Sequence, residues 1–151
     1  MKLFEKIKIS SSNKDDKKVL FVCVENAGRS QMAEGFFKKY APNGFKTRSA
    51  GTKPVSQINP IVVQAMKEVG IDISKQKSKE LTDEMIRDSD KVINMGCMDK
   101  NFCPTIWLPK VIEWGMEDPK GQSIEKAREI RDEIEQRVKE LVAEITITTQ
   151  K

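Results

Sequence analysis

Apolar and polar positions along this chain predict strands and helices in alternation. Val19–Val24 is an almost unbroken apolar run, as expected for a strand buried on both faces. Residues 30–40 then place apolar side chains at helical spacing, and Pro42 and Gly44 end that helix. Further strands are predicted at residues 45–50, 91–95 and 111–114.

Three more helices follow from capping residues and spacing. Asn59 can cap a helix that has Pro60 at its first position. Thr82 predicts the start of a short helix through Asp88. The strongest helix lies between residues 123 and about 145, where the apolar side chains form one stripe.

This alternation predicts a single α/β domain with a flavodoxin-like, four-stranded parallel sheet and helices on both faces. We expect the domain to span residues 19–146. The polar residues 1–18 predict a flexible extension, and residues 147–151 a short tail. Ligands of such sheets bind beyond the carboxyl ends of the strands, so Cys23 and Cys97 should face one crevice.

Charge and hydropathy narrow the class of protein. The 151 residues carry a net charge of +4, with lysines and acids interspersed and no basic block, which does not favour nucleic-acid binding. A mild positive excess helps to attract a small anion. No apolar run has membrane-spanning length and no signal peptide is apparent, so we expect a cytoplasmic protein that does not bind membranes.

The chain has three cysteines and no histidine. An odd number of cysteines argues against a secreted disulfide framework, and three thiols leave a structural zinc site one ligand short. No metal site is therefore predicted. A catalytic cysteine in this chain would need activation by arginine, backbone N–H groups and a helix N-terminus, because no imidazole base is available.

Cys23 is separated from Arg29 by five residues, and Ser30 follows. A tight loop at this place can aim N–H groups inward, and Gly28 avoids side-chain bulk there. The helix that begins near Ser30 adds its positive end, and the Arg29 guanidinium can hold two oxygens of an oxyanion. Ser30 can hydrogen-bond the Cys23 thiolate, and Asn26 can brace the loop. The residues expected to bind the anion are Val24, Glu25, Asn26, Ala27, Gly28, Arg29 and Ser30.

Asp118, followed by Pro119, is the candidate general acid. A carboxyl group above the loop could exchange a proton with a departing oxygen. Asp-Pro alone usually starts a turn, and Cys23 alone could be a buried structural cysteine. The combination of the loop and the Asp-Pro turn favours catalysis.

These motifs resemble the low-molecular-weight protein tyrosine phosphatase superfamily, and within it the thioredoxin-coupled arsenate reductases. The resemblance covers about residues 18–146. The segments that carry it are Arg29–Gly35, Ser49–Gly51, Asn59–Pro60, Ala65–Val69, Trp114–Gly115 and Asp118–Gly121.

The resemblance implies a thiol relay. Cys23 would attack arsenate, Cys97 would form a Cys23–Cys97 disulfide as arsenite leaves, and Cys103 would move the oxidation to a Cys97–Cys103 disulfide that thioredoxin reduces. Cys97 and Cys103 stand in a polar loop bounded by Gly96 and Pro104, where five intervening residues permit a disulfide. Two small buried cysteines would be the structural alternative.

The resemblance also implies that no cofactor is required. Some relatives bind potassium near the cysteine loop, and Asn26, Glu34 and Ser49 match the expected ligand types. Lys79 stands where such relatives have an acidic residue, and our hypothesis is that its ammonium replaces the ion; a solvated surface lysine is the alternative.

Two other functions fit the same residues. The first is a phosphatase of phosphotyrosine or small phosphate esters that uses Cys23, Arg29 and Asp118. The second is a redox-sensing or oxyanion-binding module that signals through its terminal helix, which would leave Asp118 without an obvious task.

Overall fold

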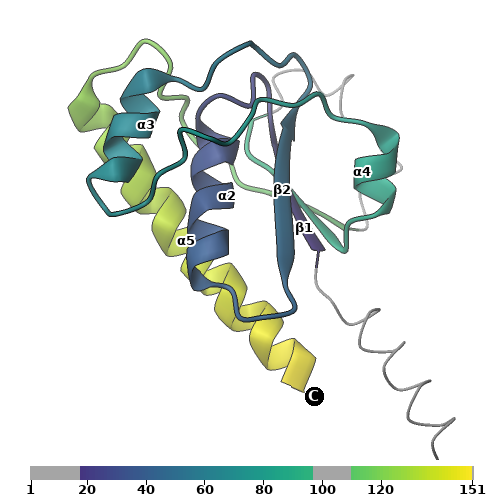
Figure 1. Cartoon of the computed structure of the whole chain (residues 1–151). Coiled ribbons are helices and arrows are strands. Elements are labelled where there is room, and N and C mark those ends of the chain that lie inside the picture. Colours follow the sequence, from purple (N-terminus) through teal and green to yellow (C-terminus); the bar gives the residue numbers. More distant parts are fainter. Residues whose placement is uncertain (1–17, 97–109, 151) are drawn as a thin grey trace, which may run out of the picture.

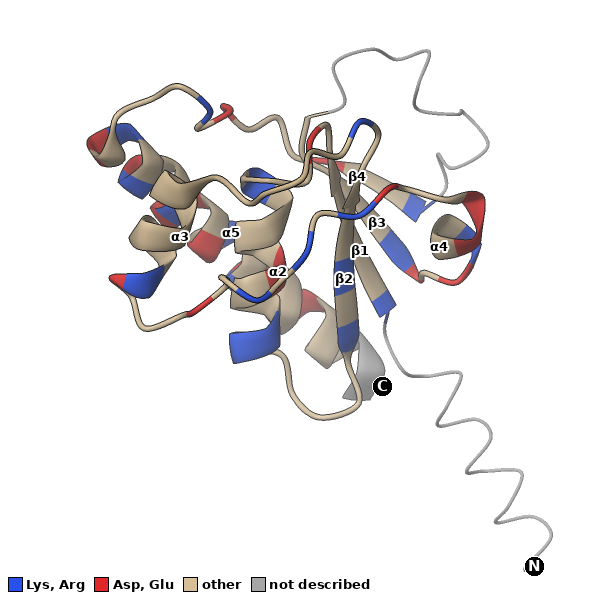
Figure 2. Ribbon diagram, turned by 45° about the horizontal axis from the view of Figure 1, so that its top comes forward, with Lys and Arg blue, Asp and Glu red and all other residues tan. Residues whose placement is uncertain are grey.

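The computed structural model describes residues 18–96 and 110–150, and residues 1–17, 97–109 and 151 lie outside the described part. Its four strands form one parallel sheet in the order β2-β1-β3-β4, which confirms the predicted sheet (Figure 1; all four strands are labelled in Figure 2). The strands are β1 (Lys18–Cys23), β2 (Lys46–Gly51), β3 (Lys91–Asn94) and β4 (Val111–Glu113).

Helices cover both faces of the sheet, as the sequence predicts. Three of them lie on one side, and the fourth lies alone on the other (Figures 1 and 2). The first group is α2 (Arg29–Tyr40), α3 (Pro60–Lys67) and α5 (Ile124–Gln150), and the single helix is α4 (Asp83–Arg87). Among the residues that the structure describes, no helix has the length and apolar character needed to cross a membrane.

Alternate residues of β1 point into two separate cores. Phe21 and Cys23 belong to the large core that α2 and α5 cover, whereas Leu20 and Val22 belong to a small core beneath α4. This alternation is the period of two that a strand imposes on its side chains. It places the Cys23 side chain on the same side of the sheet as α2.

The helix caps follow the sequence at two places. Asn59 Oδ1 accepts a hydrogen bond from the N–H group of Ile61 at 2.9 Å, and Thr82 Oγ1 accepts one from Met85 at 3.1 Å. By contrast, α2 begins after Gly28 with no side-chain cap. Its first N–H groups therefore have no capping side chain and can donate to an anion.

Several boundaries differ from the sequence prediction by a residue or so, and the end of the terminal helix differs by more. Lys18 already pairs with Lys46 as the first residue of β1. The terminal helix continues to Gln150 instead of ending near residue 145. Thr146, Thr148 and Thr149 have low helix propensity, so the residue pattern does not predict this last turn.

Replacing Ile134 by alanine should lower the free energy of unfolding by about 2–5 kcal/mol, because this side chain of α5 is fully buried in the large core. The same substitution at Ile147, which is 59% exposed on the same helix, should change it by less than about 0.5 kcal/mol. Urea denaturation of both variants measures the difference. Equal losses would show that α5 is not anchored through this face.

Candidate active site

The loop between β1 and α2 turns its carbonyl groups away from the pocket. The carbonyl oxygens of Cys23, Val24, Glu25 and Ala27 accept hydrogen bonds at 2.8–3.2 Å from the N–H groups of Thr52, Lys53, Val55 and Asn59, respectively. In contrast, none of the N–H groups from Glu25 to Ser30 donates to an acceptor within residues 18–96 or 110–150. The loop therefore presents several free donors, as an anion-binding nest does.

The Cys23 thiol lies at the base of this loop. It is 2% exposed, and its Sγ is 2.8 Å from Ser30 Oγ. Asn26 Nδ2 donates to the same Ser30 oxygen at 2.8 Å, which leaves the hydroxyl proton of Ser30 free to point at the sulfur. The Cys23 sulfur therefore lies next to a hydroxyl group and the N-terminus of α2.

Asn26 connects the loop to its surroundings. Its φ of 52° is in the left-handed region, which asparagine tolerates better than most residues. Its Oδ1 accepts hydrogen bonds from the Lys79 N–H at 2.8 Å and from Gln31 Nε2 at 3.0 Å. Gly51 is also required, because a Cβ there would lie 2.4 Å from the Val24 carbonyl oxygen.

Arg29 is buried and held by two segments of the chain. Its Nη1 donates to the carbonyl oxygens of Met95 and Met116, each at 3.0 Å. Its Nη2 is 3.4 Å from Asp118 Oδ2, and its buried Nε has no partner among the described residues. The guanidinium edge formed by Nε and Nη2 can therefore donate to two oxygens of a tetrahedral anion.

Asp118 and Pro119 lie directly against the loop. The Asp118 carboxylate is half exposed and accepts a hydrogen bond from the Lys120 N–H at 3.0 Å. A Cβ on Gly28 would be 3.0 Å from Pro119 Cγ, so Gly28 makes room for this turn. The bulk that Gly28 avoids thus belongs to Pro119, far away in the sequence.

A small cavity of about 170 Å³ lies between the loop and the Asp118 turn. Its lining contains Cys23, Glu25, Ala27, Gly28, Arg29, Val55, Gln57, Asn59, Asp118 and Lys120. The structure thus brings together the predicted nucleophile, anion loop and acid. Cys97 and Cys103 lie outside the described residues.

Sequence reasoning missed several residues of this site. Gly96 has a φ of 149°, and a Cβ there would be 2.1 Å from Arg29 Nη1, so only glycine leaves space for the guanidinium. Val55 and Gln57 also line the pocket, and they belong to the segment whose N–H groups donate to the carbonyl oxygens of the cysteine loop. A glycine directly after the third predicted strand was the available signal for Gly96, whereas no local signal marked the other two.

A buried thiol, an arginine with a free donor edge and a nearby carboxyl group, placed at the carboxyl end of β1, define a phosphatase-type oxyanion site on a parallel α/β sheet. Comparison with known proteins supports this assignment of the site. The chain belongs to the low molecular weight phosphotyrosine protein phosphatase family, whose model matches residues 18–151.

Three similar proteins illustrate the range of this family. A Synechocystis protein called glutaredoxin arsenate reductase is 40% identical over 86% of this chain and 99% of its own length. A solved arsenate reductase in its phosphate-binding state is 39% identical, with a TM-score of 0.78 over 85% of this chain and 98% of that one. A thioredoxin-dependent arsenate reductase from Corynebacterium glutamicum is 37% identical, with a TM-score of 0.74 over 96% of this chain and 73% of that one.

Replacing Gly96 by alanine should weaken binding of inorganic phosphate by at least about tenfold, because the new Cβ would displace the Arg29 guanidinium. Calorimetric titration of the reduced protein measures this. Gly70→Ala is the matched control, since Gly70 also has a positive φ but nothing within 4 Å. A similar loss in both variants would point to backbone strain and not to Arg29.

Proposed function

We propose that this protein is an arsenate reductase in which Cys23, Cys97 and Cys103 form a thiol relay. The observation that carries the proposal is the anion site itself: the loop, whose N–H groups have no acceptor among the described residues, and Arg29 line one cavity with Cys23. The names of its relatives, arsenate reductases at 37–40% identity, support arsenate as the anion.

In the first step, the Cys23 thiolate attacks the arsenic atom of bound arsenate. An S–As bond forms, and one oxygen leaves as water after Asp118 gives it a proton. Arg29 and the loop N–H groups stabilise the charge on the remaining oxygens. Ser30 and Asn26 position the sulfur and the loop around it.

In the second step, the Cys97 thiolate attacks the Cys23 sulfur. The S–As bond breaks, its electron pair passes to arsenic, and As(V) becomes As(III), which leaves as arsenite. Cys103 then attacks Cys97, which releases the Cys23 thiolate and forms a Cys97–Cys103 disulfide. An external dithiol reduces that disulfide by the same exchange chemistry. This cycle requires a reducing compartment, so we place the protein in the cytoplasm.

Thioredoxin is the proposed reductant. The Corynebacterium relative is called thioredoxin-dependent, whereas the Synechocystis relative is called a glutaredoxin arsenate reductase. Both reductants deliver a thiol to a protein disulfide. An assay with each reductant in turn identifies which of them supports turnover.

The second candidate is a phosphatase of phosphotyrosine or small phosphate esters. The family name favours it, and Cys23, Arg29 and Asp118 would serve both reactions. Only arsenate reduction consumes electrons and needs Cys97 and Cys103. The two reactions can therefore be separated by serine substitution.

We expect Cys23→Ser to abolish both arsenate-dependent NADPH oxidation, measured with thioredoxin and thioredoxin reductase, and hydrolysis of p-nitrophenyl phosphate. Cys97→Ser or Cys103→Ser should stop multiple arsenate turnovers and leave ester hydrolysis within about twofold, because hydrolysis uses water instead of a second thiol. Ester hydrolysis by the unaltered protein without arsenate turnover would make it a phosphatase.

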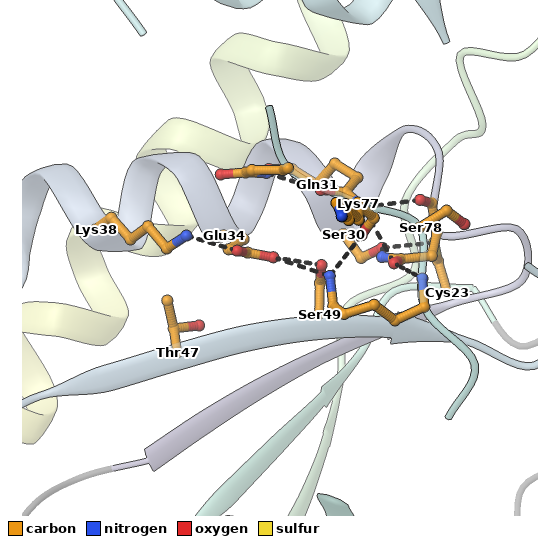
Figure 3. A network of polar contacts seen from close by, with 12 residues as sticks. Cys23, Ser30, Gln31, Glu34, Lys38, Thr47, Ser49, Lys77 and Ser78 are labelled. Carbon is orange, nitrogen blue, oxygen red and sulfur yellow. Dashed lines mark hydrogen bonds and ion pairs between the residues drawn. The ribbon is translucent and has the colours of Figure 1, made fainter. Parts of the chain in front are cut away.

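We further infer that Lys79 supplies the positive charge that a monovalent cation supplies in some relatives. Its Nζ lies 3.9 Å from Glu34 Oε1 and donates to the Lys77 carbonyl oxygen at 2.5 Å. Ser49 donates to the same buried carboxylate at 2.5 Å (Figure 3). Burial lowers the pKa of Lys79, and the charge of Glu34 opposes that shift. A cation at this place would meet the ammonium group, so these residues do not fit an additional ion.

Arsenate turnover should therefore be equal in potassium and sodium chloride at the same ionic strength. Lys79→Met should lower turnover severalfold, because the buried Glu34 carboxylate loses one cation, and potassium should restore part of the loss. Lys53→Met, another lysine near the loop, is the control. Potassium-specific activation of the unaltered protein would contradict the inference.

A further inference from the structure

One ion pair crosses the cavity between the cysteine loop and the acid turn. Lys120 Nζ lies 2.6 Å from Glu25 Oε2, and both residues line the cavity. Glu25 is the second residue after Cys23, and Lys120 is the second residue after Asp118. Nothing in the proposed relay uses either side chain.

The Glu25 carboxylate poses an electrostatic problem for an anion site. It is 30% exposed and stands on the wall that an incoming oxyanion must approach. An uncompensated carboxylate there would repel the substrate and also the Cys23 thiolate. The hydrogen bond and charge of Glu25 raise the pKa of Lys120, so the ammonium stays charged and compensates the carboxylate.

Lys120 also acts on the acid turn. Its backbone N–H donates to Asp118 Oδ1 at 3.0 Å, while its ammonium binds Glu25. The turn is thus attached to the loop at three points: Asp118 to Arg29, Pro119 to Gly28, and Lys120 to Glu25. The third attachment joins two residues of the cavity lining.

The size of the cavity indicates which anions fit beside the Glu25–Lys120 ion pair. Its volume of about 170 Å³ is below the range of about 300–1,000 Å³ that is usual for sites of drug-sized ligands. A free tetrahedral oxyanion needs little space. The ring of an aryl phosphate would have to extend out of the cavity, past lining residues that include Glu25 and Lys120.

We propose that the Glu25–Lys120 ion pair is the specificity-determining element of the site, which admits small inorganic oxyanions and disfavours aryl phosphate esters. The pair neutralises the one carboxylate on the loop and closes the side through which an ester group would project. This inference deepens the proposed function and rests on it for the identity of the anion.

Opposite effects of the two single substitutions test the charge argument. Lys120→Gln should weaken binding of inorganic phosphate roughly fivefold at low salt, since Glu25 is left uncompensated, and Glu25→Gln should tighten it, since the ammonium is freed. The double variant should return toward the unaltered protein. Both single effects should shrink at 0.5 M salt, where the Debye length falls to about 4 Å. Calorimetric titration of the reduced proteins gives the affinities.

The double variant also tests selection. Its kcat/KM for p-nitrophenyl phosphate should rise about threefold or more, while its phosphate affinity changes little, because closure is lost without a change in net charge. The control is Lys126→Gln, which breaks the exposed 2.9 Å pair with Glu117. It should alter neither quantity.

Several results would overturn the inference. These are an effect of Lys120→Gln no larger than that of Lys126→Gln, effects of the same sign in both single variants, an unchanged ester-to-phosphate ratio in the double variant, or no phosphate binding by the unaltered protein. The binding measurements need no arsenate turnover. If they follow the expected pattern in a protein that does not reduce arsenate, the ion-pair inference stands and the proposed function fails.

Discussion

The burial of the Arg29 guanidinium is the constraint on which the rest of the site depends. Removing a full charge from water is costly unless hydrogen bonds and opposite charge compensate it. Here the compensation comes from the carbonyl groups of Met95 and Met116 and from the Asp118 carboxylate. Gly96 provides the space in which the guanidinium lies. The end of β3, the segment after β4 and the start of α2 are thereby fixed relative to one another.

The parallel sheet makes this convergence possible. All four strands run in one direction, so the residues that follow β1, β3 and β4 meet at one edge of the sheet. Because α2 starts at the same edge, its N-terminus points at Cys23. The N–H groups of the segment that follows β2 donate hydrogen bonds to the carbonyl groups of the cysteine loop. The N–H groups of the loop itself are therefore left on the pocket side. The fold thus creates an anion site mainly from backbone groups.

The sequence was sufficient where the signal is local. The buried β1, the caps at Asn59 and Thr82 and the five-residue interval between Cys23 and Arg29 are all features of neighbouring residues, and the sheet class followed from them. Contacts between distant residues could not be predicted in this way.

The missed contacts share one physical reason. The contact of Gly96 with Arg29, the bond from Lys79 to Asn26 and the Glu25–Lys120 pair depend on packing that only the folded chain defines. Gly96 precedes a cysteine and Lys120 follows Asp-Pro, and each of these sequence patterns is compatible with several roles. The residue that each one contacts in the folded chain determines which role it has. Cys97 and Cys103 lie outside the described residues, so their roles belong to the proposal.

The charges of the pocket explain how a site without histidine can hold two anions. A thiolate at Cys23 and a bound oxyanion repel each other, and Asp118 adds a third negative group when it is ionised. The Arg29 guanidinium, the loop N–H groups and the N-terminus of α2 supply positive charge and partial charge on the same side of the sheet. Most of this field comes from backbone groups, which do not titrate. Against this fixed positive field, a single extra carboxylate on the loop would be a large perturbation, which gives a physical reason for Glu25 to be paired with Lys120.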